Sequence, residues 1–317
     1  MGNLRQARDR AGRRGASAGP PQFEQLSMSE VIMDVLLTND DGYQAGGMAA
    51  IRDAMINAGL NVLSVAPDGP RSGTSRSASF RKPVVMTRDG GDDRNPIYRA
   101  DGTPVDCVRA AILSGLAKDV RLVVSGINEG ANLGDDATYS STFGSAAEGA
   151  LLGLPALSIS QQARDGRFRL VDLTDYDYGW CSEVGAELAA WMIASPPPPR
   201  SILNVNAPGI LKDRRLKITA LDHRVWDPGH YEAVETDSGH GWYTFLTNVD
   251  RDPVFTMRPG SDASAVAAGH VSVTPVSFDF GDVRAAGRLR RWLRQSVDVI
   301  NPRLGASDGE CRSGCCG

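Results

Sequence analysis

Short apolar runs alternate with helical segments through the first two thirds of the chain, and this alternation constrains the fold most strongly. The runs are apolar at nearly every position, so we expect each of them to be buried on both faces. Helices between the runs then have to cover both faces of a parallel sheet through right-handed crossovers, which predicts a doubly wound α/β sandwich. The expected strands of this part span residues 33–38, 61–66, 121–125, 156–160 and 202–206.

The pattern changes after Pro208. Two short runs at 231–234 and 242–246 flank a glycine-containing turn and predict a β-hairpin. A further strand is expected at 271–274, and a basic amphipathic helix at 283–300. The helices expected before Pro208 cover residues 47–58, 104–116, 143–153 and 180–194.

Composition divides the chain into four parts. Residues 1–30 are rich in Arg, Gly, Ala and Pro without a hydrophobic period, so we expect a disordered basic extension. Residues 31–210 carry the alternating pattern and form the expected α/β core. Residues 211–280 hold the hairpin and a closing strand, and residues 281–317 hold the last helix and a flexible tail. The cysteines of that tail are Cys311, Cys315 and Cys316.

Charge and cysteine content exclude several classes of protein. The net charge of −4, from 34 basic and 38 acidic residues, argues against coating nucleic acid through bulk positive charge. No apolar run reaches the roughly 18 residues that span a bilayer, and no apolar segment follows the first arginines as in a secretory signal. Five cysteines in 317 residues are too few for a disulfide framework. We therefore expect a cytoplasmic protein without a nucleic-acid polymer or a membrane as partner.

Polar residues follow three of the expected strands directly. Residues 39–42 (Asn-Asp-Asp-Gly) follow the first strand, residues 67–73 follow the second, and the glycine-rich residues 126–134 follow the third. Ligands of open parallel sheets bind beyond the carboxyl ends of the strands. These three segments are therefore expected at one rim of the sheet, although tens of residues separate them in the sequence.

The adjacent carboxylates Asp40 and Asp41 are the sharpest chemical feature of this set. Two like charges held together repel each other unless they are protonated or neutralised by a cation. A simple turn is the alternative, because Asn-Asp-Asp-Gly is good turn chemistry. Ser72 and Asn128 add neutral oxygen donors, so the set would suit Mg²⁺, Mn²⁺ or Ca²⁺ better than zinc. The four histidines lie far from it in the sequence.

A second feature is a set of backbone N–H groups that could bind an anion. The glycines of 126–134 leave successive backbone N–H groups unobstructed. Residues 138–142 lead into the helix expected at 143–153, and helix N-termini attract phosphate. Simple capping of that helix by Ser140 or Thr142 is the alternative. Neither the Walker nor the dinucleotide-binding pattern is present.

These segments together resemble the SurE family of survival proteins, which are metal-dependent 5′/3′-nucleotidases. The matching strings are LLTNDDGYQAGGM (36–48), VAPDGPRSGTS (65–75), GTPVDCV (102–108), VSGINEGANLGDD (124–136), YSSTFGSAAEG (139–149), LPALSIS (154–160), ILNVNAP (202–208) and HVSVTP (270–275). The resemblance implies an α/β fold with a Rossmann-like, doubly wound, mostly parallel sheet in a three-layer sandwich. A projecting β-hairpin and a C-terminal helix complete the expected fold.

The resemblance also implies one divalent cation per subunit, with Mg²⁺ or Mn²⁺ favoured. Its implied metal ligands are Asp40, Asp41, Ser72 and Asn128. Its implied phosphate-binding positions are Asn39, Asn132, Ser140 and Thr142. Ser141 departs from the pattern because the family usually has glycine there, and its hydroxyl could either narrow the approach to phosphate or donate one more hydrogen bond. The family commonly pairs subunits through C-terminal segments, so a homodimer or higher homo-oligomer is expected, although residues after 275 diverge.

The resulting hypothesis is hydrolysis of a small-molecule phosphomonoester, namely nucleoside monophosphate to nucleoside and phosphate. Asp40 and Asp41 are the expected catalytic residues, since they would hold the ion and one of them would accept the proton of the attacking water. A covalent aspartyl-phosphate is a second route. Two other functions stay open. One is a phosphatase for a biosynthetic intermediate such as a modified nucleotide or a sugar phosphate, and the other is a metal-dependent nucleotide-binding protein without turnover.

Overall fold

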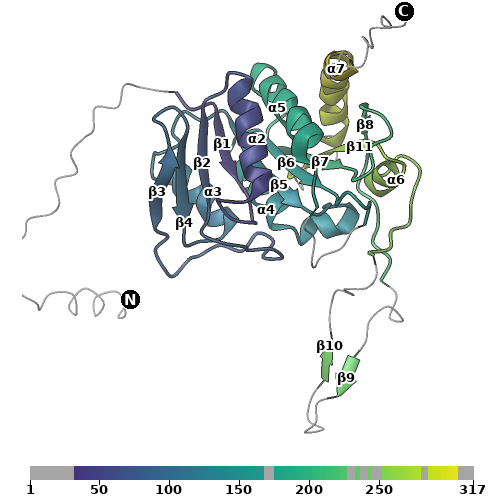
Figure 1. Ribbon diagram of the computed structural model, residues 1–317, viewed down its shortest axis with the longest axis horizontal. Helices are drawn as coiled ribbons and strands as arrows, with labels where there is room; N and C mark the ends of the chain where they lie inside the picture. The colour runs from purple at the N-terminus through teal and green to yellow at the C-terminus, as the bar shows by residue number, and fades with distance from the viewer. Residues whose placement is uncertain are drawn as a thin grey trace, which may run out of the picture. The chain divides into compact units, whose positions relative to one another are not determined.

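One mixed β-sheet organises the residues that the computed structural model describes, which are 32–167, 175–226, 233–235, 242–244, 252–279 and 285–305. Its strands are β1 (Val35–Thr38), β2 (Val62–Pro67), β3 (Met86–Gly91), β4 (Pro96–Ala100), β5 (Leu122–Glu129), β6 (Ala156–Gln161), β7 (Ser201–Ala207), β8 (Leu216–Ile218) and β11 (Val271–Ser277). Their order across the sheet is β3-β4-β2-β1-β5-β6-β7-β11-β8 (Figure 1). The six strands from β4 to β7 are parallel, whereas β3 and β11 run antiparallel to their neighbours β4 and β7.

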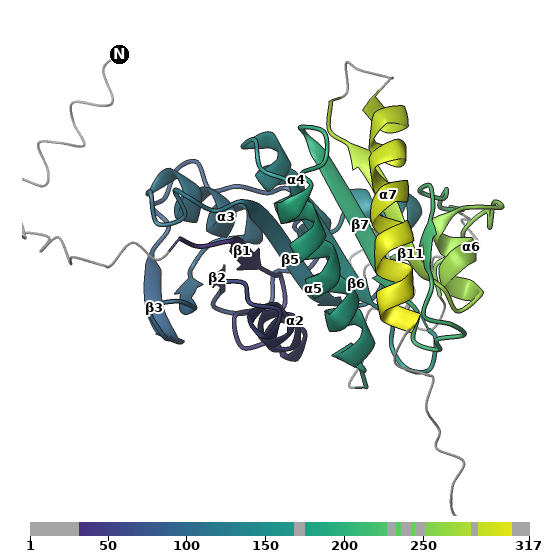
Figure 2. The same cartoon turned by 90° about the horizontal axis from the view of Figure 1, so that it is seen from above.

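Helices cover both faces of this sheet (Figure 1, Figure 2). One face carries α2 (Gly46–Asn57), α5 (Tyr178–Ala194) and α7 (Ala285–Gly305), and the other carries α3 (Pro104–Leu113) and α4 (Ser141–Leu151). The strands β1, β2, β6 and β7 are therefore buried along their whole length, as the continuous apolar runs require. The expected three-layer α/β fold is confirmed.

Strand β5 differs from the sequence-based expectation in a way that matters for the site. It continues to Glu129 instead of ending at Ser125, and its register with β6 shifts between Ser125 and Asn128. Gly126 allows this irregularity, because its φ is +131° and a Cβ there would lie 2.2 Å from the carbonyl oxygen of Ile159. Asn128 therefore belongs to the end of the strand and not to a loop after it.

Several short elements were not predicted, and the C-terminal part joins the main sheet. Strands β3, β4 and β8 and helix α6 (Asp262–Ala267) are missing from the expectation, whereas the hairpin is present as β9 (Ala233–Glu235) paired antiparallel with β10 (Trp242–Thr244). Strand β11 lies between β7 and β8 within the sheet.

The expected basic extension, the hairpin turn and the cysteine-containing tail lie outside the described residues. Within the described ranges, no helix is both long enough and apolar enough to cross a membrane.

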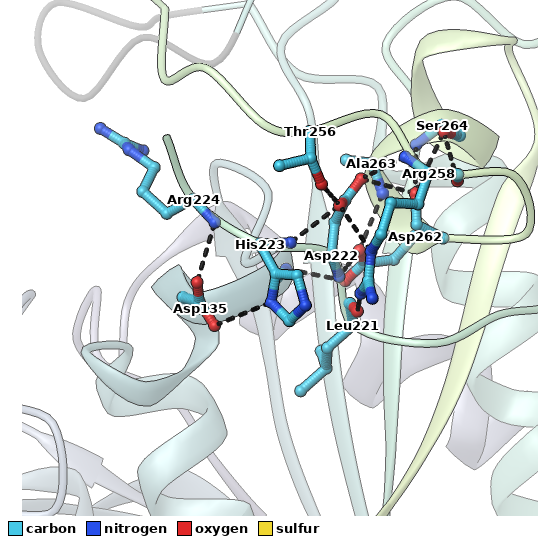
Figure 3. Close-up of polar contacts among 12 residues, drawn as sticks. Asp135, Leu221, Asp222, His223, Arg224, Thr256, Arg258, Asp262, Ala263 and Ser264 are labelled. Carbon is cyan, nitrogen blue, oxygen red and sulfur yellow. Dashed lines mark hydrogen bonds and ion pairs between the residues drawn. The ribbon is translucent and has the colours of Figure 1, made fainter. Parts of the chain in front are cut away.

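Two buried aspartates connect the segment after β8 with the glycine-rich loop and with α6 (Figure 3). Asp222 accepts hydrogen bonds from the hydroxyls of Ser261 (2.6 Å) and Thr256 (2.5 Å). Asp262 accepts hydrogen bonds from the backbone N–H groups of Gly134 (2.8 Å) and Asp222 (2.9 Å). Burial alone would raise the pKa of Asp222, but the hydrogen bonds to its carboxylate lower that pKa to about 2. The ionised form of Asp222 therefore stabilises this part of the fold.

Replacing Asp222→Asn is expected to lower the free energy of unfolding at pH 7 by about 2–3 kcal/mol, which corresponds to the depression of its pKa. A carboxylate with a depressed pKa stabilises the fold above its unfolded-state pKa near 4. This stabilisation is lost as the pH falls toward 2, so the deficit of the variant should shrink below pH 4. Urea unfolding between pH 7 and pH 3 measures it, with the exposed Asp53→Asn as control. A deficit that does not change with pH would contradict this assignment.

Candidate functional site

The sheet reverses its strand order between β1 and β5, and part of the predicted site lies at the carboxyl ends of these two strands. From β1 the chain proceeds outward through β2 to β4, and it then returns to the other side of β1 as β5. Connections that leave in opposite directions open a crevice beyond the carboxyl ends of such neighbouring strands. The segment after β1 contains Asp40 and Asp41, and the end of β5 contains Asn128.

Asn39 shapes the turn that follows β1. Its side-chain amide nitrogen donates to the carbonyl of Gly42 (2.9 Å), and its side-chain oxygen accepts from the N–H of Gly42 (3.2 Å). The side chain is fully buried. The turn interpretation of residues 39–42 is thus confirmed, and it is compatible with a cation site because the turn is closed by Asn39 and not by the carboxylates. One N–H of the Asn39 amide is not used in these contacts, and its contact with phosphate stays a prediction.

The two carboxylates lie in an environment that disfavours their charges. Asp40 is only 3% exposed, and its Oδ1 accepts a hydrogen bond from Thr142 Oγ1 (2.5 Å). Burial raises the pKa of Asp40, and this hydrogen bond lowers it by a smaller amount. The pKa of Asp41 is raised by burial first, and then by the negative charges of Asp40 and Glu129. A bound cation would relieve both the repulsion and the burial of charge.

Backbone hydrogen bonds attach the segments that carry Ser72 and Asn128 to the acid pair and its turn. The N–H of Arg71 donates to the carbonyl of Asp40 (2.7 Å), which brings the next residue, Ser72, to the turn. The N–H of Glu129 donates to Asp41 Oδ2 (3.3 Å), which fixes the end of β5 beside the same turn. Asn128 donates its side-chain amide hydrogen to the carbonyl of Gly130 (2.6 Å), so its side-chain oxygen is the atom left for a metal.

The donor set of Asp40, Asp41, Ser72 and Asn128 fits a hard divalent cation, because it offers two carboxylates, a hydroxyl and an amide oxygen. In the part of the chain that the structure describes, no group of three or more His, Cys, Asp or Glu side chains is arranged to hold a metal. A metal site here therefore needs the serine and asparagine oxygens as well as the acid pair. The thiols of Cys107 and Cys181 are buried, and burial raises the pKa of both.

Helix α4 begins at the acid pair. Ser140 is its N-cap, and its Oγ accepts a hydrogen bond from the N–H of Phe143 (3.1 Å), so the capping interpretation is confirmed for this residue. Thr142, in the first turn, donates to Asp40 as described above. The free N–H groups and the positive end of the helix dipole are thus directed to the rim where an anion would lie.

Asn132 links the glycine-rich loop to the ends of β6 and β7. Its backbone N–H donates to Asn206 Oδ1 (2.7 Å), and its side chain donates to Ser160 Oγ (2.9 Å). Its carbonyl accepts hydrogen bonds from the side chains of Asn204 (2.9 Å) and Asn206 (3.1 Å). Sequence reasoning missed these two asparagines, although polar residues at alternate positions of the apolar run at 202–206 were a usable signal. Contact of Asn132 with phosphate stays a prediction.

Two further contacts near the acid pair were also missed. Tyr178 donates its hydroxyl to Glu129 Oε1 (2.7 Å), and its ring stacks on Tyr176 with centroids 5.8 Å apart. Nothing in the sequence pairs the start of α5 with the end of β5, because 49 residues separate Tyr178 from Glu129. The contact closes one side of the acidic centre with aromatic rings.

Other acidic residues near the site have ion-pair or hydrogen-bond partners. Asp136 forms an ion pair with Arg224, and Asp135 accepts the N–H of Arg224 (2.8 Å). Glu148 is buried on α4 and pairs with Arg76 (3.0 Å) and Arg109 (2.6 Å). These ion pairs hold surface segments against the core.

Comparison with known proteins gives a consistent result. The family described as "Survival protein SurE" matches residues 35–228. The 5′-nucleotidase SurE of Maridesulfovibrio salexigens is 36% identical over 264 residues, which cover 82% of this chain and 98% of that protein. The 5′-nucleotidase SurE of Methylococcus capsulatus is 37% identical over 263 residues, with the same two coverages.

A solved structure agrees with these relatives. The crystal structure of the SurE protein from Aquifex aeolicus superposes with a TM-score of 0.63 at 30% sequence identity, and the match covers 81% of this chain and 98% of that one. The similarity thus includes nearly the whole length of each relative and the strand ends that carry the acid pair. This chain belongs to the SurE family.

Proposed function

We propose that this chain is a metal-dependent 5′/3′-nucleotidase that hydrolyses nucleoside monophosphates to nucleoside and phosphate. The hydrogen bond between Thr142 and Asp40 carries this proposal, because it joins the first turn of α4 to the acid pair. An anion at the helix N-terminus and a cation at the carboxylates would then be neighbours, as hydrolysis of a phosphate ester requires. Relatives that match over nearly their whole length are 5′-nucleotidases, which supports the same reaction.

The residues that would hold the cation are Asp40, Asp41, Ser72 and Asn128. Mg²⁺ or Mn²⁺, one per subunit, suits these oxygen donors. When bound, such a cation supplies Lewis acidity to a phosphate oxygen and lowers the pKa of water. Asp40 is the more buried acid and already accepts from Thr142, so Asp41 is the better placed of the two to take the proton of the attacking water.

The phosphate side of the site would be formed by the start of α4 and by two amides. The free N–H groups of the first turn and the hydroxyl of Ser140 would stabilise charge on the phosphoryl oxygens. Thr142 would contribute through its backbone in that turn, because its hydroxyl proton is donated to Asp40. Asn39, in the turn after β1, and Asn132, in the glycine-rich loop, would add amide donors if they face the phosphate. These groups are already held by the fold, so little reorganisation is needed as charge moves to the leaving oxygen.

We also propose a substrate class, an oligomeric state and a cellular compartment. The substrate is a small phosphomonoester, and the chain acts as a homodimer or higher homo-oligomer, in keeping with its family. We place it in the cytoplasm, where the unpaired thiols of Cys107 and Cys181 would stay reduced.

Removing either carboxylate is expected to abolish turnover. Asp40→Ala and Asp41→Ala should each lower kcat/KM for a nucleoside monophosphate by at least about 10²-fold, because each removes charge that holds the cation. A chelator should do the same to the unaltered enzyme, and added Mn²⁺ or Mg²⁺ should restore it. Phosphate release measures the rate, with exposed Asp53→Ala as control. Unchanged turnover in the two variants and with chelator would refute the proposal.

A panel of substrates separates nucleotidase activity from the other functions considered. We expect nucleoside 5′- and 3′-monophosphates to be hydrolysed with higher kcat/KM than sugar phosphates under saturating Mn²⁺. A preference for sugar phosphates or for a modified nucleotide would indicate a phosphatase of a biosynthetic intermediate. Tight binding of nucleotide without phosphate release would indicate a protein that does not turn over its ligand.

The acid pair should destabilise the protein when no cation is bound. A carboxylate with a raised pKa destabilises the fold wherever it is ionised, so Asp41→Asn should raise the free energy of unfolding at pH 8 in chelator, by about 1–3 kcal/mol. The gain should vanish below pH 4, where Asp41 is protonated in both the folded and the unfolded state. Urea unfolding with and without Mn²⁺ measures this, and Mn²⁺ should stabilise the variant less than the unaltered protein. A variant less stable in chelator would contradict the electrostatic argument.

A further inference from the structure

Ser141, the first residue of α4, directs its hydroxyl at the loop that carries Ser72. The side chain of Ser141 is fully buried. Its Oγ accepts a hydrogen bond from the N–H of Thr74 (2.9 Å) and donates one to the carbonyl of Arg71 (2.9 Å). The hydroxyl of Thr74 lies 2.9 Å from the same Oγ and also reaches the carbonyl of Arg71 (3.0 Å). One side chain of α4 thus holds the residues on both sides of Ser72 and Gly73.

The two residues between these contacts have little support of their own. Ser72 and Gly73 are exposed, Gly73 has a positive φ of +72°, and a Cβ on Gly73 would meet no atom within 4 Å. Their position therefore depends on the hydrogen bonds at Arg71 and Thr74. Directly before Ser72, the N–H of Arg71 donates a hydrogen bond to the carbonyl of Asp40 (2.7 Å). The loop is consequently fixed between β1 and α4.

The next residue extends the same attachment. Ser75 donates its hydroxyl to the carbonyl of Thr138 (2.7 Å), and its own carbonyl lies so close to α4 that a Cβ on Gly144 would be 2.4 Å away. A side chain at Gly144 would therefore push the loop away from the helix. The first turns of α4 and the turn before it together form the surface on which residues 71–75 lie.

We propose that Ser141 is a positioning residue for cation binding, which holds the 71–74 loop so that Ser72 completes the donor set of the acid pair. This inference rests on the proposed function, since it takes Ser72 as a ligand. The same contacts indicate that the Ser141 hydroxyl does not bind phosphate. The single proton of Ser141 Oγ has acceptors within the protein, namely the carbonyl of Arg71 and the hydroxyl of Thr74, and the side chain is fully buried, so it is not available to a phosphate oxygen. The hydroxyl acts on the metal side of the site through the loop.

Ser141→Ala is expected to weaken Mn²⁺ binding by about 10-fold, the usual size of effect when a partner of a metal ligand is removed. Isothermal titration of protein stripped with chelator measures the dissociation constant without any turnover. Thr74→Val should weaken binding in the same direction, whereas Thr74→Ser, which keeps the hydroxyl, should stay within about twofold of the unaltered protein. Ser182→Ala is the matched control, because it removes a buried serine hydroxyl from α5, on the opposite face of the sheet.

A double-mutant cycle with Ser72→Ala separates positioning from a general loss of stability. If Ser141 acts through Ser72, then Ser141→Ala should have no further effect on Mn²⁺ affinity once residue 72 is alanine. An equal loss in both backgrounds, or an unchanged affinity in Ser141→Ala despite a lower melting temperature, would overturn the inference. In either case nucleotide hydrolysis by the unaltered protein would still stand. Absence of Mn²⁺ and Mg²⁺ binding by the unaltered protein would instead overturn the proposed function and this inference together.

Discussion

The contact between Thr142 and Asp40 is the interaction on which the rest of the site depends. It joins the first turn of α4 to the end of β1, across 102 residues of sequence, and both side chains are buried. The helix covers one face of the sheet, so this contact directs its N-terminus at the carboxyl end of a central strand. A helix N-terminus and an acid pair are thereby combined in one place, where the proposed phosphate and cation would be neighbours, without a dedicated nucleotide-binding motif.

This arrangement carries an energetic cost that the fold has to offset. Two adjacent carboxylates, one of them buried, oppose folding as long as both are ionised and no cation is bound. The surrounding sheet compensates with continuous apolar packing in β1 and β2 and with helices on both faces. Binding of the proposed cation would therefore remove an unfavourable interaction, and ligand-dependent stability would follow from that linkage.

The sequence was informative where local pattern and burial coincide, and uninformative where a contact depends on tertiary structure. Continuous apolar runs predicted β1, β2, β5, β6 and β7, because a strand covered on both faces is mostly apolar along its length. Strand β3 was missed because it is an exposed edge strand, rich in charged residues and glycine, which packs on one neighbour only. The position of Asp40 and Asp41 at the rim could be predicted from topology, since the residues that end a parallel strand lie at its carboxyl edge.

The role of individual polar side chains was harder to predict. Ser140, Ser141 and Thr142 are consecutive small hydroxyl residues, and each of them meets a different partner: the N–H of Phe143, the 71–74 loop and Asp40. Helical geometry turns successive side chains by about 100°, so three neighbours cannot all face one phosphate. The sequence showed only that hydroxyls were concentrated there. One of these hydroxyls caps the helix, one holds the loop and one contacts the carboxylate. Which hydroxyl has which role depends on the segments that the sheet brings against each side of α4.

The four donors of the proposed cation site differ in how firmly the fold holds them. Asp40, Asp41 and Asn128 follow or end strands in the middle of the sheet, and hydrogen bonds at Gly42, Glu129 and Gly130 fix their backbone or their side chains. Ser72 lies on an exposed loop that is held only from its two sides. In the proposed site the rigid donors would set where a cation lies, whereas the serine would close the donor set only as far as the loop is ordered. Order in the loop and occupancy of the site would therefore be coupled, and the hydroxyl of Ser141 lies at the point where this proposed coupling is made.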